Sequence, residues 1–429
     1  MRPFTIKQLP YDLTPVAGLA LVGQHLQRLG PVFKRIDAAL PVRTGVASSD
    51  IVRSYLGLLA QGKSDFDAIE NFRGDTFFKQ SLGIGLLPSS ATLRQRMDSG
   101  AVQLVEHVPA LIETLLGAVR PDLGVLPCGW LPLDIDVFPM DNSGTAKEGV
   151  GRTYTGVDGY CPLAAYLGTQ GYCLELALRP GVQHSASGTQ LDLKRIVPMA
   201  QRLSAGGGKA PILVRLDAGF DSADLMREMA ACNSAGLPRV DWLIKWNPRK
   251  TEVATLAALL DANQATRWQH PRAGKRVTVW DEQVRIEGFE RPMRRVMRLT
   301  ERTIDAKGQL LIEPQWVLEG WSTTLAGRQF DAQAIITLYE GHGAHEQFHS
   351  EFKTDLDLER LPSGKFDTND AIVHLASFAY NCLRLLGQLG LTGEIAPIRH
   401  PAKRRRLKTV LQEIMYRAAK FVAHARRLV

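Results

Sequence analysis

Two aspartates stand two positions apart inside an apolar segment, where carboxylates are costly to bury. The segment is GWLPLDIDVFPM, and its acids are Asp134 and Asp136. Side chains at positions i and i+2 of a strand point to the same face of a sheet. A buried carboxylate needs a compensating partner, so a cation or a metal ion is expected beside this pair. A structural pair bonded to the backbone or to an arginine is the alternative.

A third aspartate follows a second apolar segment, APILVRLDAGF, in which Asp217 stands where the strand meets a loop. Ligand sites of open α/β sheets form at such strand ends. If the strands follow the RNase H order, the first and fourth are neighbours, and Asp136 and Asp217 face each other. Paired carboxylates on adjacent strands suit Mg²⁺, which prefers oxygen ligands. Asp217 could instead only cap the helix that begins near Ser222.

The third candidate acid lies in a predicted long helix from about residue 332 to 354, which contains YEGHGAHEQFHSEFK. Tyr339, His342, Glu346 and Lys353 are predicted to share one helical face. A glutamate beside two strand carboxylates completes a two-metal site, which activates water or a 3′-OH for in-line attack on phosphate. Glu351 ranks second as the third ligand.

The same segment also raises a zinc hypothesis, because three histidines surround Glu346. Their order is H-x2-H-E, formed by His342, His345 and Glu346, with His349 following. Zinc hydrolases instead carry H-E-x2-H or H-x2-E-H on a helix. A zinc hydrolase is therefore disfavoured. None of the five cysteines forms a C-x2-C pair, so a structural zinc site is not expected either.

The elements that must position these acids follow the order β-β-β-α-β-α-β between about residues 129 and 248. That order predicts an α/β fold, with an RNase H-like catalytic domain and a β-rich insertion. A chain of 429 residues is too long for one ordinary core. We expect a helical DNA-end-binding region (1–125), a catalytic core in two parts (126–248 and 326–390), the β insertion between them (249–325) and a basic, helical C-terminal tail (391–429).

The positive charge of the chain is concentrated in this tail. From residue 399 onward, ten Lys and Arg residues accompany a single acid, whereas the whole chain has a net charge of +8. The run PAKRRRLKTV suggests that Arg404, Arg405 and Arg406 contact DNA phosphates, although a solvated helix end is the alternative. A helix that docks by Leu411, Ile414, Met415 and Ala418 is expected after it. We find no secretory signal and expect a cytoplasmic, nucleoid-associated protein without a membrane partner.

These segments together resemble the DDE transposases of bacterial insertion sequences, in the branch marked by Y-x2-R-x3-E-x6-K (transposase DDE domain group one). Tyr339, Glu346 and Lys353 match that spacing, whereas His342 stands where the family usually has Arg. LDIDVFPMDNSGTAKEGVGRTYTGVDGYCPL resembles the family's first-Asp segment, RLDAGFDS its second, and the tail its C-terminal end. The resemblance covers roughly residues 120–429, and the N-terminal part more weakly.

The resemblance implies that Asp136, Asp217 and Glu346 hold two Mg²⁺ or Mn²⁺ ions. Asp134 stays the alternative first acid, because the family's acid is often followed two positions later by Thr, and Phe138 fills that position here. Tyr339 and Lys353 would contact the DNA backbone near the cut, with His342 between them. Trp316 or Trp321 of the insertion could stack on an extruded base, although core packing is the alternative for both.

The implied activity is DNA transposition. The protein would bind terminal inverted repeats of double-stranded DNA, cleave phosphodiester bonds and join the 3′-OH ends to target DNA, as a homodimer in the DNA complex. Two alternatives remain: an RNase H-like nuclease or resolvase without strand transfer, and a catalytically silent DNA-binding relative. A possible helix-turn-helix would place the stretch LPSSATLRQRMDSGAV as its recognition helix; the alternative is a small packing helix.

Overall fold

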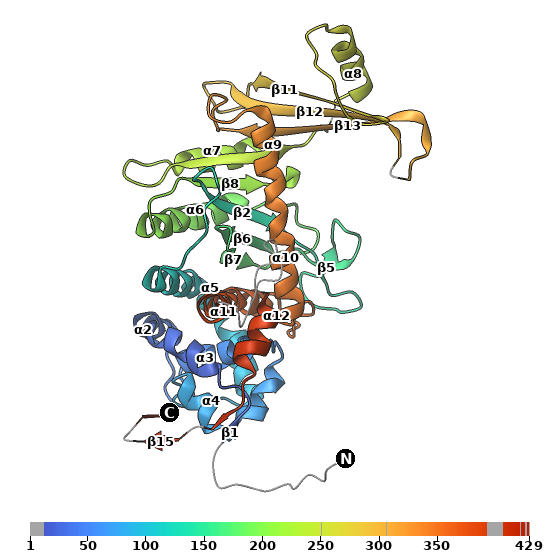
Figure 1. The fold of residues 1–429 in the computed structure, drawn as a ribbon. Helices are drawn as coiled ribbons and strands as arrows, with labels where there is room; N and C mark the ends of the chain where they lie inside the picture. The colour runs from blue at the N-terminus through green and yellow to red at the C-terminus, as the bar shows by residue number, and fades with distance from the viewer. Residues whose placement is uncertain are drawn as a thin grey trace, which may run out of the picture.

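A mixed sheet of nine strands forms the centre of the molecule, in the order β10-β11-β12-β13-β9-β8-β2-β6-β7. The computed structural model describes residues 13–249, 251–305, 307–392, 406–420, 422–424 and 427–428. Helices flank the sheet, and a helical body lies beyond its β7 edge (Figure 1). The predicted α/β class is therefore confirmed.

Five strands form the part of the sheet that carries the candidate acids: β2 (Leu131–Val137), β6 (Leu163–Leu167), β7 (Tyr172–Ala177), β8 (Ile212–Leu216) and β9 (Val240–Trp246). β2 is parallel to β8 and antiparallel to β6, and β8 is parallel to β9. Every residue of β6 and β8 is buried, as expected for strands covered on both faces. These strands, and the neighbouring positions of the first and the fourth, agree with the sequence prediction.

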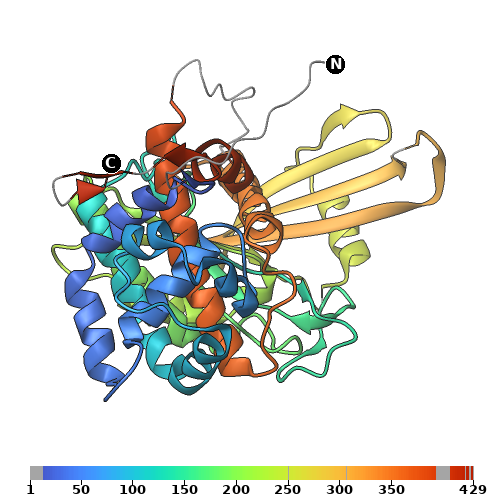
Figure 2. The same ribbon diagram turned by 90° about the horizontal axis from the view of Figure 1, so that it is seen from below.

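The predicted β insertion continues this sheet rather than forming a separate one. Its strands are β10 (Gln269–Arg272), β11 (Lys275–Val284), β12 (Met293–Ile304) and β13 (Leu310–Thr323), and β13 pairs antiparallel with β9. The long strands project beyond the helical body (Figures 1 and 2). Helix α8 (Val253–Ala262) packs against them through a separate small core that contains Met297 and Leu318.

The two faces of the central strands pack against different helices, because strand side chains alternate. Leu213 of β8 and Leu243 of β9 pack with Ile335 of α9 (Ala332–Glu340). Val214 instead belongs to the main core, together with Ile196 of α6 (Thr189–Gly206). Helix α7 (Ala223–Ala231) joins that second side. Odd-numbered β8 positions thus face α9, which places Arg215 and the following Asp217 between the sheet and that helix.

The run of helical turns that starts with α9 is not a single α-helix, as the sequence had suggested. A 3-10 turn, η3 (Gly341–Ala344), follows α9; then come α10 (His345–Ser350) and a π-helical turn, η4 (Glu351–Asp355). Two glycines in the first turn, Gly341 and Gly343, weaken its preference for α-helix. Since 3-10 and π turns advance by different angles from an α-helix, the run departs from the uniform rotation on which the prediction of one shared face was based. The run still crosses the sheet as one rod (Figure 1).

Residues before β2 are mainly helical, as predicted. The elements are α1 (Leu19–Gln27), α2 (Gly30–Ala39), α3 (Ser48–Leu59), η1 (Phe66–Phe72), α4 (Thr76–Ser81) and α5 (Ser90–Val119). Helix α5 is long and apolar enough to cross a membrane by length and composition alone. In the fold it lies against α11 (Phe366–Gly390), the apolar helix predicted as core. Because its apolar side chains Leu93, Leu104 and Leu111 are buried there, we interpret α5 as a packing helix.

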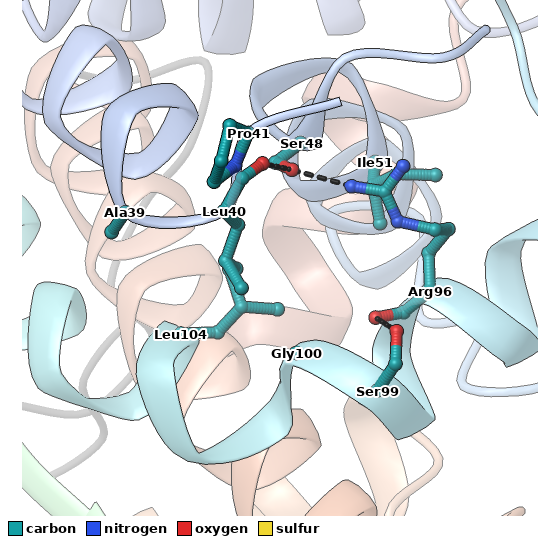
Figure 3. A pocket seen from close by; sticks show the side chains of 9 residues that line it. All are labelled: Ala39, Leu40, Pro41, Ser48, Ile51, Arg96, Ser99, Gly100 and Leu104. Atoms are coloured by element: carbon teal, nitrogen blue, oxygen red, sulfur yellow. Dashed lines mark hydrogen bonds between the residues drawn. The ribbon is translucent and has the colours of Figure 1, made fainter. Parts of the chain in front are cut away.

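A hollow of about 360 Å³ lies between α2, α3 and the start of α5 (Figure 3). Arg96 donates hydrogen bonds to the Val46 carbonyl and the Ser48 hydroxyl, which in turn donates to the Leu40 carbonyl. Arg94 pairs with Asp67 at 3.7 Å. Both arginines of the proposed recognition helix thus have partners within this helical body, which favours the packing alternative for this stretch.

Within its described residues, the C-terminal tail is helical only over a short stretch. It contains α12 (Leu407–Val410), the π-helical turn η5 (Leu411–Met415) and the short strands β14 (Ala419–Lys420), β15 (Ala423–His424) and β16 (Arg427–Leu428). Leu411 and Met415 dock as predicted, but Ala418 is exposed and lies outside the helix. β14 pairs with β1 (Leu13–Thr14), so the tail returns to the N-terminal helices. That strand pairing ends the helix earlier than its apolar spacing had suggested.

Candidate functional site

Asp136 and Asp217 stand side by side at the ends of two parallel strands. The last registered pair of β2 and β8 is Ile135 with Leu216, so the next positions along the two strands are the two aspartates. Neighbouring strands are about 4.8 Å apart. Burial, followed by the negative charge of Asp136, raises the pKa of Asp217, although the Gly219 N–H donates to its carboxylate at 2.9 Å. Asp217 therefore also caps the short turn after β8.

Asp136 has a histidine as its direct partner. Its Oδ2 lies 2.7 Å from Nε2 of His345, and its Oδ1 accepts the backbone N–H of Val137 at 2.8 Å. Burial alone would raise the pKa of Asp136, but the hydrogen bond from His345 is the main contribution that lowers it overall. The carboxylate is thus kept ionised at neutral pH.

The pKa of Tyr154, in the loop between β4 (Gly151–Arg152) and β5 (Asp158–Tyr160), is influenced by all three predicted acids. Partial burial raises its pKa to about 12, with further contributions from the charges of Asp136, Asp217 and Glu346. Glu346 itself is exposed at the start of α10. Glu346 directly follows His345, the histidine that contacts Asp136.

Asp134, the alternative first acid, is held by an arginine. Its two oxygens accept from Nε and Nη2 of Arg215 at 2.6 and 2.7 Å, and both side chains are almost fully buried. Nη1 of Arg215 donates to the Leu338 carbonyl at 2.7 Å. Such a bidentate pair uses both oxygens of the carboxylate. The structure thus favours a structural role for Asp134 and leaves Asp136 as the strand acid available to a ligand.

Tyr339 and His342, the first two signature residues, lie close to the acids. Burial raises the pKa of Tyr339, and the charges of Asp217 and Asp136 raise it further. His342 is buried 4.0 Å from Asp134, and burial lowers its pKa to about 4. It is therefore neutral at neutral pH, unlike the arginine that the family usually has at this position.

Lys353, the last signature residue, is engaged within the chain. Its Nζ donates to the Pro139 carbonyl at 3.0 Å and pairs with Glu359 at 3.1 Å. Glu351 is fully buried and pairs with Arg384 of α11. That ion pair explains why Glu351, the second-ranked third ligand, is not free to join the acids.

The remaining residues that were predicted to contact DNA lie in the β insertion and in the C-terminal tail. Trp321 is only 1% exposed and lies in the core beneath α9, so for this residue the packing alternative holds. Trp316 is half-buried in the projecting strands, with the guanidinium of Arg276 5.4 Å from its ring centre. Arg406 pairs with Asp355 at 3.5 Å. Arg404 and Arg405 lie outside the described residues.

Sequence reasoning missed four residues of the site. Tyr154 stood in the segment that resembles the family's first-Asp region, but no spacing singled it out. His345 and His349 are four residues apart on a helix, a spacing that predicts a shared face, yet we weighed them only against zinc-protease motifs. Lys245 lies near the end of β9, and its positive charge partly offsets the rise in the pKa of Asp217. The available signal was a lysine near the end of the strand adjacent to β8.

The donor set fits a hard divalent cation. Asp136 and Asp217 are adjacent carboxylates, and the negative charge of Asp136 adds to the effect of burial in raising the pKa of Asp217. Carboxylate oxygens are the ligands that Mg²⁺ and Mn²⁺ prefer. Glu346 is exposed at the start of α10, directly after the histidine that contacts Asp136.

Two comparisons relate the chain to known proteins. The chain resembles a solved structure of piggyBac transposase in a synaptic complex with hairpin DNA, at 12% sequence identity and a TM-score of 0.39, over 95% of this chain and 79% of that one. A search among curated proteins returns no match. The model of a protein family described as Transposase DDE domain group 1 matches residues 23–429. Since that match spans nearly the whole chain, the protein belongs to the family Transposase DDE domain group 1.

Proposed function

We propose that the protein is the DNA transposase of an insertion sequence, which binds terminal inverted repeats, cleaves DNA and joins the 3′-OH ends to a target. The observation that carries the proposal is the placement of Asp136 beside Asp217 at the ends of two neighbouring parallel strands. Membership of a DDE transposase family supports this assignment of the three acids.

The finer fold assignment is an RNase H-like core. Counted along the chain, β2, β6, β7, β8 and β9 take the spatial order 3-2-1-4-5, with the second strand antiparallel to its neighbours. This order supports the assignment, because it places the first strand beside the fourth, as expected for an RNase H order. The projecting strands then extend the fifth strand of that core.

The three acids would hold two Mg²⁺ or Mn²⁺ ions. Bound there, such ions activate an attacking oxygen and stabilise the leaving oxygen of the phosphodiester. The chain's own contribution is to position the ligands. β2 and β8 fix Asp136 and Asp217, while Arg215 holds the end of α9 against the sheet through the Leu338 carbonyl.

DNA contacts near the cut are assigned to Tyr339, His342 and Lys353. Since His342 is neutral and buried, it would contribute by position rather than by charge. Lys353 would exchange the Pro139 carbonyl and Glu359 for a phosphate, a stronger charge-assisted partner. The proposal includes terminal inverted repeats and target DNA as the binding partners. It also includes a homodimer in the DNA complex and a cytoplasmic, nucleoid-associated location.

The test is a reaction of the purified protein with a supercoiled plasmid that carries the element's own ends. We expect nicked and linear products, followed by joined ends, with Mg²⁺ or Mn²⁺ and none of these after chelation with EDTA. Zn²⁺ should not restore the reaction, because the catalytic ligands are oxygens and Zn²⁺ favours tetrahedral sites with N or S donors. Cleavage without joining would favour the nuclease or resolvase alternative; binding without cleavage would indicate a silent relative.

A second prediction concerns the basic tail. Each phosphate contact contributes about −0.9 to the slope of log affinity against log salt concentration. Replacing Arg404 and Arg405 by Ala should therefore make the slope shallower by up to roughly 1.8. Arg406→Ala serves as the matched control: since Arg406 pairs with Asp355, its loss should loosen tail docking and leave the slope nearly unchanged.

The measurement is a salt titration of binding to end DNA and to random DNA. The preference for end DNA should change little, because phosphate contacts position a protein and base contacts specify the sequence. An unchanged slope in the Arg404/Arg405 variant would assign the run to solvated surface. A lost preference at constant slope would show that these arginines read bases.

A further inference from the structure

A histidine-rich cluster lies directly beside the predicted acid site. Asp136, His345 and His349 each offer one ligand atom, and these three atoms lie within 4.8 Å of one another. The two histidines are four residues apart, so they project from the same side of the helical run toward the sheet. The cluster therefore joins one strand carboxylate to two imidazoles.

His349 has a ring nitrogen without a partner. The side chain is buried, and its Nε2 makes no hydrogen bond within the described part of the chain. Its ring stacks on Phe138 with 4.2 Å between ring centres and also lies against Tyr166. Leaving a buried polar atom unpaired is costly, so a native structure that keeps one needs an explanation.

His345 has the second contact that metal-binding histidines usually show. Its Nδ1 lies within hydrogen-bond distance of the His342 carbonyl, while its Nε2 points to Asp136. A hydrogen bond from one ring nitrogen to a carbonyl fixes the tautomer and orients the other nitrogen as a ligand. His345 is thus already oriented to coordinate a metal ion through Nε2.

We propose that Asp136, His345 and His349 form a binding site for a divalent transition-metal ion, with Zn²⁺ as the preferred physiological occupant. Two imidazoles and one carboxylate with an open fourth position are a common zinc ligand set. Imidazole ligands favour Zn²⁺ and its neighbours over Mg²⁺, which prefers oxygen. The site differs from the oxygen site of the three acids but shares Asp136 with it.

The shared carboxylate gives this site a regulatory consequence, which rests on the proposed function. A Zn²⁺ ion bound to Asp136 and the two histidines removes that ligand from the Mg²⁺ or Mn²⁺ site. Zn²⁺ should then inhibit DNA cleavage even when Mg²⁺ is abundant. Metal binding is measured on the protein without DNA, so this test of the site does not depend on whether the protein is a transposase.

The experiment is a titration of the purified full chain with Co²⁺, a spectroscopic substitute for Zn²⁺, followed by displacement with Zn²⁺. We expect the visible absorption of low-coordinate Co²⁺ at one equivalent, and its loss on addition of Zn²⁺. His345→Gln and His349→Gln should each weaken binding at least about tenfold, since even the loss of a residue that only orients a ligand costs 10–100-fold. His270→Gln, an exposed histidine on β10, is the matched control and should bind like the wild type.

A second measurement does not depend on the variants folding. X-ray absorption of the Zn²⁺-loaded wild-type protein should show two imidazole ligands with Zn–N distances of about 2.0–2.1 Å. Equal Co²⁺ affinity in wild type and both histidine variants, or a spectrum with oxygen ligands alone, would overturn the proposal. Zn²⁺ binding at the histidines without inhibition of an active enzyme would keep the site and remove its regulatory role.

Discussion

Asp217→Asn should abolish DNA cleavage while leaving DNA binding intact or slightly improved. The substitution keeps the shape of the side chain and its acceptor for the Gly219 N–H, but removes the charge beside Asp136. Metal ions contribute several kcal/mol to the stabilisation of the transition state. At about 1.4 kcal/mol for each factor of ten, the cleavage rate should fall by roughly a thousandfold or more.

The matched control is Asp224→Asn, an exposed aspartate at the start of α7 that pairs with Arg227 on the surface. We expect this variant to cleave at the wild-type rate. Rates come from single-turnover cleavage of labelled end DNA, and affinities from band shifts of the same DNA without metal. If Asp217→Asn still cuts, Asp217 only caps the turn after β8, and the assignment of the site fails.

The strands could be predicted because their signals are local. β2, β6 and β8 are short apolar runs bounded by turn residues, and such runs are typical of strands buried on both faces. The adjacency of Asp136 and Asp217 followed from the order of these elements. Neither inference required knowledge of a long-range side-chain contact.

The rest of the site depends on contacts that the sequence does not encode locally. The change from α to 3-10 turns at Gly341–Ala344 shifts the helical rotation ahead of α10, where His345 contacts Asp136. Tyr154 reaches the acids from a loop between two-residue and three-residue strands, for which no periodicity exists. Likewise, the tail ends its helix early because β14 pairs with β1, a partner about 400 residues away in the sequence.

Asp134→Ala should cost about 3–5 kcal/mol of unfolding free energy, because it leaves the Arg215 charge buried without its partner. Asp136→Asn should cost less than about 1.5 kcal/mol, the contribution of one ordinary hydrogen bond, since it also relieves repulsion with Asp217. The measurement is urea unfolding followed by circular dichroism. A comparable loss in both variants would mean that Asp136, too, is mainly structural.

A paired replacement separates the charge from the packing at this position. Asp134→Leu combined with Arg215→Met should recover most of the stability lost in Asp134→Leu alone, because apolar side chains can replace a buried ion pair at little cost. Recovery should stay incomplete, since Arg215 also donates to the Leu338 carbonyl and so holds the end of α9 beside Tyr339. The double variant should therefore fold and still bind metal through Asp136, yet cleave DNA more slowly, because the helical run that carries Glu346 is less firmly placed. A stable double variant with wild-type cleavage would show that Asp134 and Arg215 support the fold alone and do not position the site.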